Sequence, residues 1–139
     1  MSKLKLKSKM TVKCISQKLT KEQSELVSDI FKSSDFHITI DKEYLVYGIS
    51  FDLFEGNRVC LVQHLTDYGN LVSSPIILFE VVDDRVSKHW IFKVSDSGGI
   101  NLFPESFYQA FYHDDLFEQV PQVLSDFKRV QDMLEHEFD

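Results

Sequence analysis

The sequence predicts an α+β domain with an N-terminal helix, a four- to five-stranded antiparallel sheet meander and two C-terminal helices packed on the sheet. Helical spacing of apolar residues appears near the start of the chain and again in its last third. Between these stretches lie short runs of β-branched and aromatic residues, separated by tight turns. With 139 residues, 43% of them hydrophobic, the chain is long and apolar enough to form one domain with a sizeable core.

The first eighteen residues form a basic segment, with six lysines and no acidic residue. Alternation of lysine and leucine from Lys3 to Lys7 is typical of an edge strand whose charges discourage pairing, and equally of a flexible tail. Both interpretations stay open. The predicted organisation is therefore a basic N-terminal segment over residues 1–18 and a single α+β domain over residues 19–139.

An N-terminal helix is predicted over residues 21–33. Thr20 precedes it as an N-cap, and Gln23, three residues later, completes a capping box. Apolar residues then follow at helical spacing from Leu26 to Phe31. Together these signals indicate a short amphipathic helix.

The central part of the sequence predicts the sheet. The predicted strands are 36–40, 44–54, 59–65, 71–82 and 86–94. The turns between the last four of these runs are short, which favours an antiparallel meander. Pro75 cannot donate a hydrogen bond to a ladder, so it indicates a bulge, an edge strand or a strand start. A loop rich in serine and glycine over residues 95–99 ends this part of the chain.

Two helices are predicted for the last third of the chain. Pro104 stands at or near the first position of one helix, and Pro121 opens the other. Residues 107–112 carry an aromatic stripe that we interpret as core packing against the sheet. From Val123 to Phe138, apolar residues recur at i, i+3, i+4 and i+7, which predicts an amphipathic helix with an acidic outer face.

Charge is distributed unevenly along the chain. The formal net charge is −7 and the first eighteen residues contribute +6, so the remaining 121 residues carry −13. A body this acidic repels phosphate backbones and attracts basic surfaces. The expected partner is therefore a protein with a positive face and not a nucleic acid. No run of about 18 apolar residues is present, so no membrane association is expected.

The two cysteines, Cys14 and Cys60, lack a CxxC spacing. We interpret them as reduced thiols of a cytoplasmic protein, with one disulfide between them as the alternative. The lysines around Cys14 predict a lowered thiol pKa. The sequence contains no phosphate-binding glycine loop, and no cofactor is expected.

The densest polar cluster is the run from His113 to Glu118, which also contains Asp114 and Asp115. Carboxylates beside a histidine are the residue types that ligate a divalent metal or transfer protons. Their spacing, however, differs from that of metal motifs such as HExxH. We therefore interpret the run as a solvated loop or partner-binding acidic patch between two helices, and assign no catalytic residue and no metal ligand.

Two stretches carry a resemblance to a class of known proteins: residues 75–90, PIILFEVVDDRVSKHW, and residues 107–118, FYQAFYHDDLFE. They resemble small cytoplasmic immunity proteins that bacteria pair with polymorphic or contact-dependent growth inhibition toxins. In those proteins a strand ending in Phe-Glu, an acidic turn and a strand with tryptophan precede a helix with an acidic patch. The resemblance covers roughly residues 43–138. It implies a non-enzymatic inhibitor that binds one cognate toxin domain, for example at the active site or an adjacent exosite of a nuclease.

An inhibitor of this kind would use carboxylates to imitate phosphates and to speed association with a basic cleft, and exposed aromatic residues as anchors. The predicted partner-binding residues are Asp83, Asp84, Tyr112, His113, Asp114, Asp115 and Glu118. The acidic turn at residues 83–84 would lie on the same face as the acidic cluster from His113 to Glu118. The expected state is a monomer or a weak homodimer.

Two other classes of function stay open from the sequence. A secretion chaperone or adaptor-type interaction module would show an exposed apolar groove and a homodimer. A small metal-dependent enzyme would hold His113, Asp114 and Asp115 together in a concave pocket.

Overall fold

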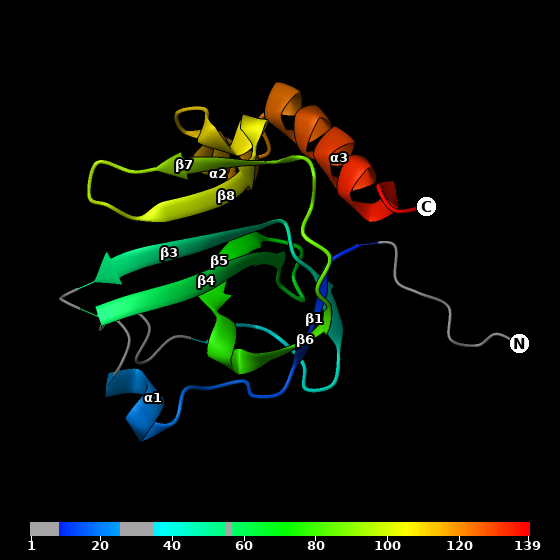
Figure 1. The fold of residues 1–139 in the computed structure, drawn as a ribbon. Coiled ribbons are helices and arrows are strands. Elements are labelled where there is room, and N and C mark those ends of the chain that lie inside the picture. Colours follow the sequence, from blue (N-terminus) through cyan, green and yellow to red (C-terminus); the bar gives the residue numbers. More distant parts are fainter. Residues whose placement is uncertain (1–8, 26–34, 55–56) are drawn as a thin grey trace, which may run out of the picture.

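The computed structural model describes residues 9–25, 35–54 and 57–139 and shows an α+β fold (Figure 1). The strands are β1 (Thr11–Cys14), β2 (Glu43–Leu45), β3 (Gly48–Phe54), β4 (Asn57–Leu65), β5 (Leu71–Pro75), β6 (Phe79–Asp83), β7 (Trp90–Val94) and β8 (Ile100–Pro104). The helical segments are α1 (Lys21–Glu25), the 3-10 turns η2 (Ile76–Leu78) and η3 (Glu105–Tyr108), α2 (Tyr112–Phe117) and α3 (Pro121–His136). The α+β class and the antiparallel pairing are confirmed, but the single predicted sheet is wrong, because these strands form two sheets.

The larger sheet has five strands in the order β5-β4-β3-β8-β7, all antiparallel to their neighbours. Strand β8 was not predicted, and it lies between β3 and β7. The sheet is therefore not a simple meander, since the β7–β8 hairpin returns to pair β8 with β3.

The smaller sheet has the order β2-β1-β6, with β1 in its centre. Two predicted strands are each divided between the sheets. The run 44–54 becomes β2 and β3, and the run 71–82 becomes β5 and β6, separated by η2 directly after Pro75. Pro75 thus ends an edge strand, which is one of the three positions that its missing N–H predicts. The lysines from Lys3 to Lys7 lie outside the described residues.

The predicted strand over residues 36–40 is wrong. Phe36 and Ile38 are buried in the core, but no ladder among the described residues includes them, and His37 has a left-handed backbone with φ of 53°. The alternation of buried and exposed side chains here therefore reflects an irregular loop. The strand predicted over 86–94 is shortened at its start and begins at Trp90.

The capping box at α1 is confirmed. The Thr20 backbone N–H donates to Gln23 Oε1 at 2.9 Å, and the Gln23 N–H donates to Thr20 Oγ1 at 3.1 Å. The rest of the predicted helix, residues 26–33, lies outside the described residues. Pro121 opens α3 as predicted.

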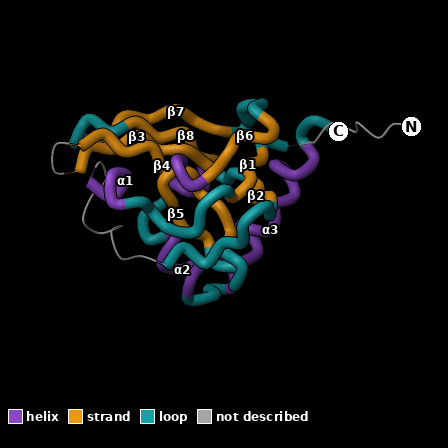
Figure 2. Tube along the Cα trace, turned by 90° about the horizontal axis from the view of Figure 1, so that it is seen from below, coloured by secondary structure: helices purple, strands orange, loops and turns teal. Residues whose placement is uncertain are grey.

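Each face of the larger sheet contributes to a different core. One face packs on the smaller sheet, through residues that include Val12, Val46, Val62, Leu78 and Trp90. The other face packs on α2, α3 and η3, through residues that include Tyr47, Phe107, Tyr112, Phe127 and Leu134. Figure 2 shows α2 and α3 together on one side of the strands, with α1 at the far end. Two C-terminal helices on the sheet are thus present, but the helix predicted from Pro104 is wrong. Pro104 ends β8 and is followed by the 3-10 turn η3, and α2 forms at residues 112–117, where a loop between two helices was expected.

Gly48 allows β8 to approach β3 closely. A Cβ atom at this position would meet the ring of Phe103 and would lie 3.0 Å from the Leu102 carbonyl oxygen. Gly48→Ala is expected to lower the free energy of unfolding by about 2 kcal/mol, because both neighbours are held in the sheet. Urea unfolding of the two proteins measures this difference, and an unchanged midpoint would contradict the packing described here.

Candidate functional site

Helix α2 carries the acidic cluster that the sequence singles out, and sharp bends bound it. Phe111 and Gln119, on either side of the helix, have left-handed backbones with φ of 64° and 60°. Such conformations are unfavourable for residues other than glycine and concentrate at functional sites. Because of these bends, α2 is a short helix of its own between η3 and α3.

The predicted site residues on α2 fall into two groups. Asp114 and Glu118 are exposed, and Asp115 is half-buried. Tyr112 is buried in the core, where its hydroxyl donates to Asp126 Oδ2 at 2.9 Å and burial raises its pKa. The Tyr112 ring therefore packs between α2 and the core and is not available as an aromatic anchor for a partner.

Beside α2 lies an apolar cavity of about 140 Å³. The residues that line it come from the β4–β5 hairpin, α2, the bend after α2 and the start of α3, and are Leu65, Gly69, Asn70, Leu71, His113, Leu116, Phe117, Gln119, Leu124 and Phe127. Phe117 is 73% exposed although it contributes to the lining. An apolar cavity of about 150 Å³ accommodates a benzene-sized group. This cavity therefore has room for one large apolar side chain.

His113 lines this cavity as a neutral group. Its ring is half-buried, 5.2 Å from the Phe107 ring, and its Nε2 lies 3.4 Å from Gln63 Oε1. Burial lowers the pKa of His113, and the opposite influence of Asp114 is smaller. His113 thus adds a neutral polar group to a mostly apolar cavity whose lining also includes Asn70 and Gln119.

The arrangement that a metal-dependent enzyme would need is only partly present. His113 lines the cavity, but Asp114 and Asp115 do not. Across residues 9–25, 35–54 and 57–139, no three His, Cys, Asp or Glu side chains stand close enough together to hold a metal ion.

The second predicted acidic turn, at residues 83–84, lies elsewhere. Asp83 accepts hydrogen bonds from Arg85 Nη2 at 2.6 Å and Nε at 3.0 Å, and the Arg85 guanidinium covers the Phe138 ring at 4.4 Å. This places the turn near the C-terminal end of α3, whereas α2 precedes its N-terminal end. A helix of 16 residues is about 24 Å long. The structure therefore does not bring Asp83 and Asp84 together with the α2 acids.

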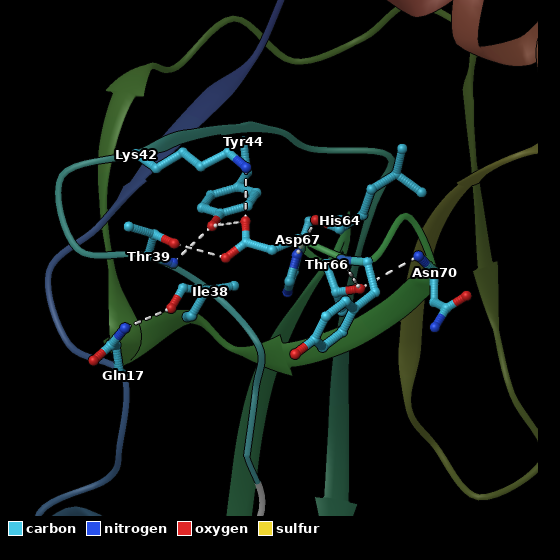
Figure 3. A network of polar contacts seen from close by, with 11 residues as sticks. Gln17, Ile38, Thr39, Lys42, Tyr44, His64, Thr66, Asp67 and Asn70 are labelled. Carbon is cyan, nitrogen blue, oxygen red and sulfur yellow. Dashed lines mark hydrogen bonds and ion pairs between the residues drawn. The ribbon is translucent and has the colours of Figure 1, made fainter.

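A polar network that sequence patterns do not reveal fixes the hairpin turn beside the cavity (Figure 3). The Asp67 carboxylate accepts hydrogen bonds from Lys42 Nζ and Thr39 Oγ1, both at 2.7 Å, and from the Tyr44 hydroxyl at 2.8 Å. These contacts, led by that of Lys42, lower the pKa of Asp67 to about 2. The network ties the loop at residues 35–42 to the turn that carries Gly69 and Asn70.

A buried serine–histidine pair lies close to this network. His64 Nε2 is 2.8 Å from Ser74 Oγ, His64 Nδ1 is 3.0 Å from the Leu65 carbonyl oxygen, and both side chains are fully buried. A nucleophile must reach its substrate, so this pair is a structural contact between β4 and β5. Burial lowers the pKa of His64.

The two cysteines are free thiols. Cys14 is fully buried in β1, and its Sγ lies 3.4 Å from the Ser16 carbonyl oxygen. Burial raises its pKa, so the lowered value predicted from nearby lysines is wrong. Burial also raises the pKa of Cys60.

The free energy of unfolding is expected to fall as the pH drops below the ordinary histidine pKa of 6.5. Burial lowers the pKa of His64 and His113 in the folded chain, so below this pH the unfolded chain binds more protons than the folded chain. Each contributes a slope of up to about 1.4 kcal/mol per pH unit. His136 acts in the opposite sense, since Asp139 raises its pKa. Urea unfolding between about pH 7 and pH 5 should show a smaller pH effect in His64→Gln than in the unchanged chain. An equal pH effect in both proteins would contradict a neutral buried His64.

Comparison with known proteins gives no relatives on which to draw. No protein-family model matches the chain, and no curated protein or solved structure matches it either. In the part of the chain that the structure describes, no helix has the length and apolar character needed to cross a membrane.

Proposed function

We propose that this chain is a non-enzymatic immunity protein that binds and neutralises a cognate bacterial toxin domain through the surface formed by α2 and its cavity. The observation that carries the proposal is the mostly apolar cavity, which has the exposed Phe117 ring at its edge. Helix α2, which carries Phe117, also exposes Asp114 and Glu118. Protein interfaces commonly combine a desolvated apolar centre with a polar rim.

The two parts of this surface have different roles. An apolar side chain of the partner enters the cavity and is desolvated against Leu65, Leu71 and Phe127, which is how binding hot spots gain most of their free energy. The carboxylates of Asp114 and Glu118 attract positive charges around that side chain and raise the association rate. A toxin with a basic cleft, such as a nuclease, presents the complementary surface.

The proposal is tested by capture followed by a functional titration. The tagged chain is used to capture its partner from a lysate of the native host, and the same capture is repeated with Phe117→Ala. The captured toxin domain is then purified and its activity titrated with the chain. We expect complete loss of activity at a fixed stoichiometric ratio, and weaker inhibition by Phe117→Ala. Binding without loss of any toxic activity would contradict the proposal.

A specific observation also favours a secretion chaperone or adaptor as a second candidate. The larger sheet exposes a continuous apolar area on one face, because Phe51, Ile100 and Val94 are paired in register across β3, β8 and β7. Phe51 is 51% and Leu53 56% exposed. An exposed apolar face of this kind suits binding of unfolded or extended chains. Capture of many unrelated proteins, lost in Phe51→Ser and retained in Phe117→Ala, would favour this function over the inhibitor.

A further inference from the structure

Strand β7 forms one edge of the larger sheet, and in the described part of the chain only β8 pairs with it. An unpaired strand edge is a template for another strand, and natural edges are commonly guarded by charges, prolines or bulges. Strand β7 contains no proline, and its register with β8 runs without a break from Trp90 to Val94. The ladder with β8 is therefore regular from Trp90 to Val94, and at its first residue the Trp90 N–H also donates to the Ser87 carbonyl oxygen at 3.4 Å.

The one charged residue of β7 does not guard this edge. The Lys93 ammonium group lies over the Tyr108 ring, 4.6 Å from its centroid, on the face of the sheet that carries η3. The Tyr108 hydroxyl is itself held there, because it donates to the Ile91 carbonyl oxygen at 2.5 Å. The most exposed apolar side chains of the strand are Phe92 and Val94, at 58% and 62%.

The edge is complementary to a second copy of itself. Phe92 is the central residue of the five in β7, so antiparallel pairing about a two-fold axis at Phe92 uses the whole strand. In this register Phe92 stands opposite Phe92 of the second copy, and Val94 stands opposite its Trp90. Both are apolar cross-strand pairs, which stabilise antiparallel sheets.

Charges outside the strand favour the same register. Lys88 and Asp96 are both exposed and stand four residues before and after Phe92. Because both residues lie in the turns that bound β7, pairing about Phe92 brings the turn with Lys88 of each copy beside the turn with Asp96 of the other, and so places opposite charges near both ends of the contact. A register centred on Lys93 would instead set two ammonium groups opposite each other, which is unfavourable.

We infer that two copies of this chain associate by antiparallel pairing of β7 with β7, which joins two five-stranded sheets into one continuous sheet. The contact consists of one short strand pair and its flanking side chains, and interfaces below about 1,200 Å² are weak. The dimer is therefore concentration-dependent. It involves no residue of the α2 surface, so it stands or falls independently of the proposed function.

Disulfide trapping tests the register. Phe92→Cys places the two new thiols directly opposite each other across the axis, within the Cα separation that a disulfide needs, whereas Val94→Cys faces Trp90. Under mild oxidation of the full chain, we expect at least about tenfold more cross-linked dimer from Phe92→Cys than from Val94→Cys. The unchanged chain, with only Cys14 and Cys60, gives the background. Equal cross-linking of the two variants would overturn the register.

Sedimentation equilibrium tests the interface without new cysteines. Val94→Lys is compared with Val86→Lys, because Val86 is exposed to a similar extent, 59%, but lies outside β7. At about 100 µM we expect a dimer fraction in the unchanged chain and in Val86→Lys, and a dissociation constant at least about tenfold higher in Val94→Lys. Circular dichroism confirms that each variant is folded. A mass of 16.2 kDa for the unchanged chain throughout this range would overturn the proposal.

Discussion

Phe127→Ala is expected to lower the free energy of unfolding by about 4 kcal/mol, because it removes a buried aromatic ring from the core under α3. The Phe127 ring lies 5.2 Å from the Tyr47 ring and 6.4 Å from the Phe107 ring. It also forms part of the cavity lining. Its loss would leave a void that the Tyr47 ring, between β2 and β3, and the Phe107 ring, on η3, cannot fill. Unfolding in guanidinium chloride, monitored by circular dichroism, measures the difference.

Phe117→Ala is the matched control for this variant. It removes the same side chain from the neighbouring helix, but Phe117 is exposed, so its effect on stability is expected to stay within about 0.5 kcal/mol. Comparing the two variants thereby distinguishes a residue that stabilises the fold around the cavity from one that is exposed for contact with a partner. Similar losses of stability in the two variants would contradict the packing of α2 and α3 described here.

The largest expected effect on binding comes from reversing the exposed charges of α2. Asp114→Lys combined with Glu118→Lys is expected to weaken binding to the captured toxin domain by about 100-fold or more, since like charges would then face each other across the interface. Both side chains are exposed, so the fold should be retained. Isothermal titration calorimetry at physiological ionic strength measures the dissociation constant.

The control for this variant changes the net charge by the same amount at the other end of α3. Asp84→Lys combined with Asp132→Lys alters two exposed acids near the C-terminal end of that helix. We expect binding to change by no more than a few-fold, through loss of long-range attraction. If the two double variants weaken binding equally, the partner does not distinguish the α2 surface from the rest of the acidic body.

Local signals in the sequence predict local structure well in this chain. Thr20 and Gln23 make the reciprocal hydrogen bonds of a capping box, and Pro121 begins a helix whose apolar spacing matches its buried residues Phe127, Val130 and Leu134. Each of these features depends on contacts within a few residues. Local geometry is therefore sufficient to specify them.

The division into two sheets depends on contacts that no local pattern encodes. The run 44–54 has strand character throughout, yet it leaves the smaller sheet after Leu45 and enters the larger one at Gly48. Periodicity shows that a strand exists but not which neighbours it pairs with. The loop at residues 36–40 shows the reverse error, because alternating burial arises there without any ladder.

The candidate site, like the fold, is predicted by the sequence only where its residues are close together along the chain. The sequence predicts the exposed acids of α2, which are adjacent along the chain. It does not predict the cavity, because Leu65 and Leu71 reach it from a hairpin some fifty residues earlier. The sequence assigns Tyr112 both to the aromatic core stripe and to the partner-binding residues, and its burial and its hydrogen bond to Asp126 decide for the core.

Hydrogen exchange of the chain, measured with and without the captured toxin domain, tests the binding surface most directly. Backbone amides of residues 65–71 and 113–124 should become protected in the complex, because they surround the cavity beside α2. Residues 80–85 and β7 should exchange at unchanged rates when the chain concentration is kept low enough to hold it monomeric. Protection at residues 80–85 or β7, with none around the cavity, would contradict the assignment of the α2 surface as the partner-binding site.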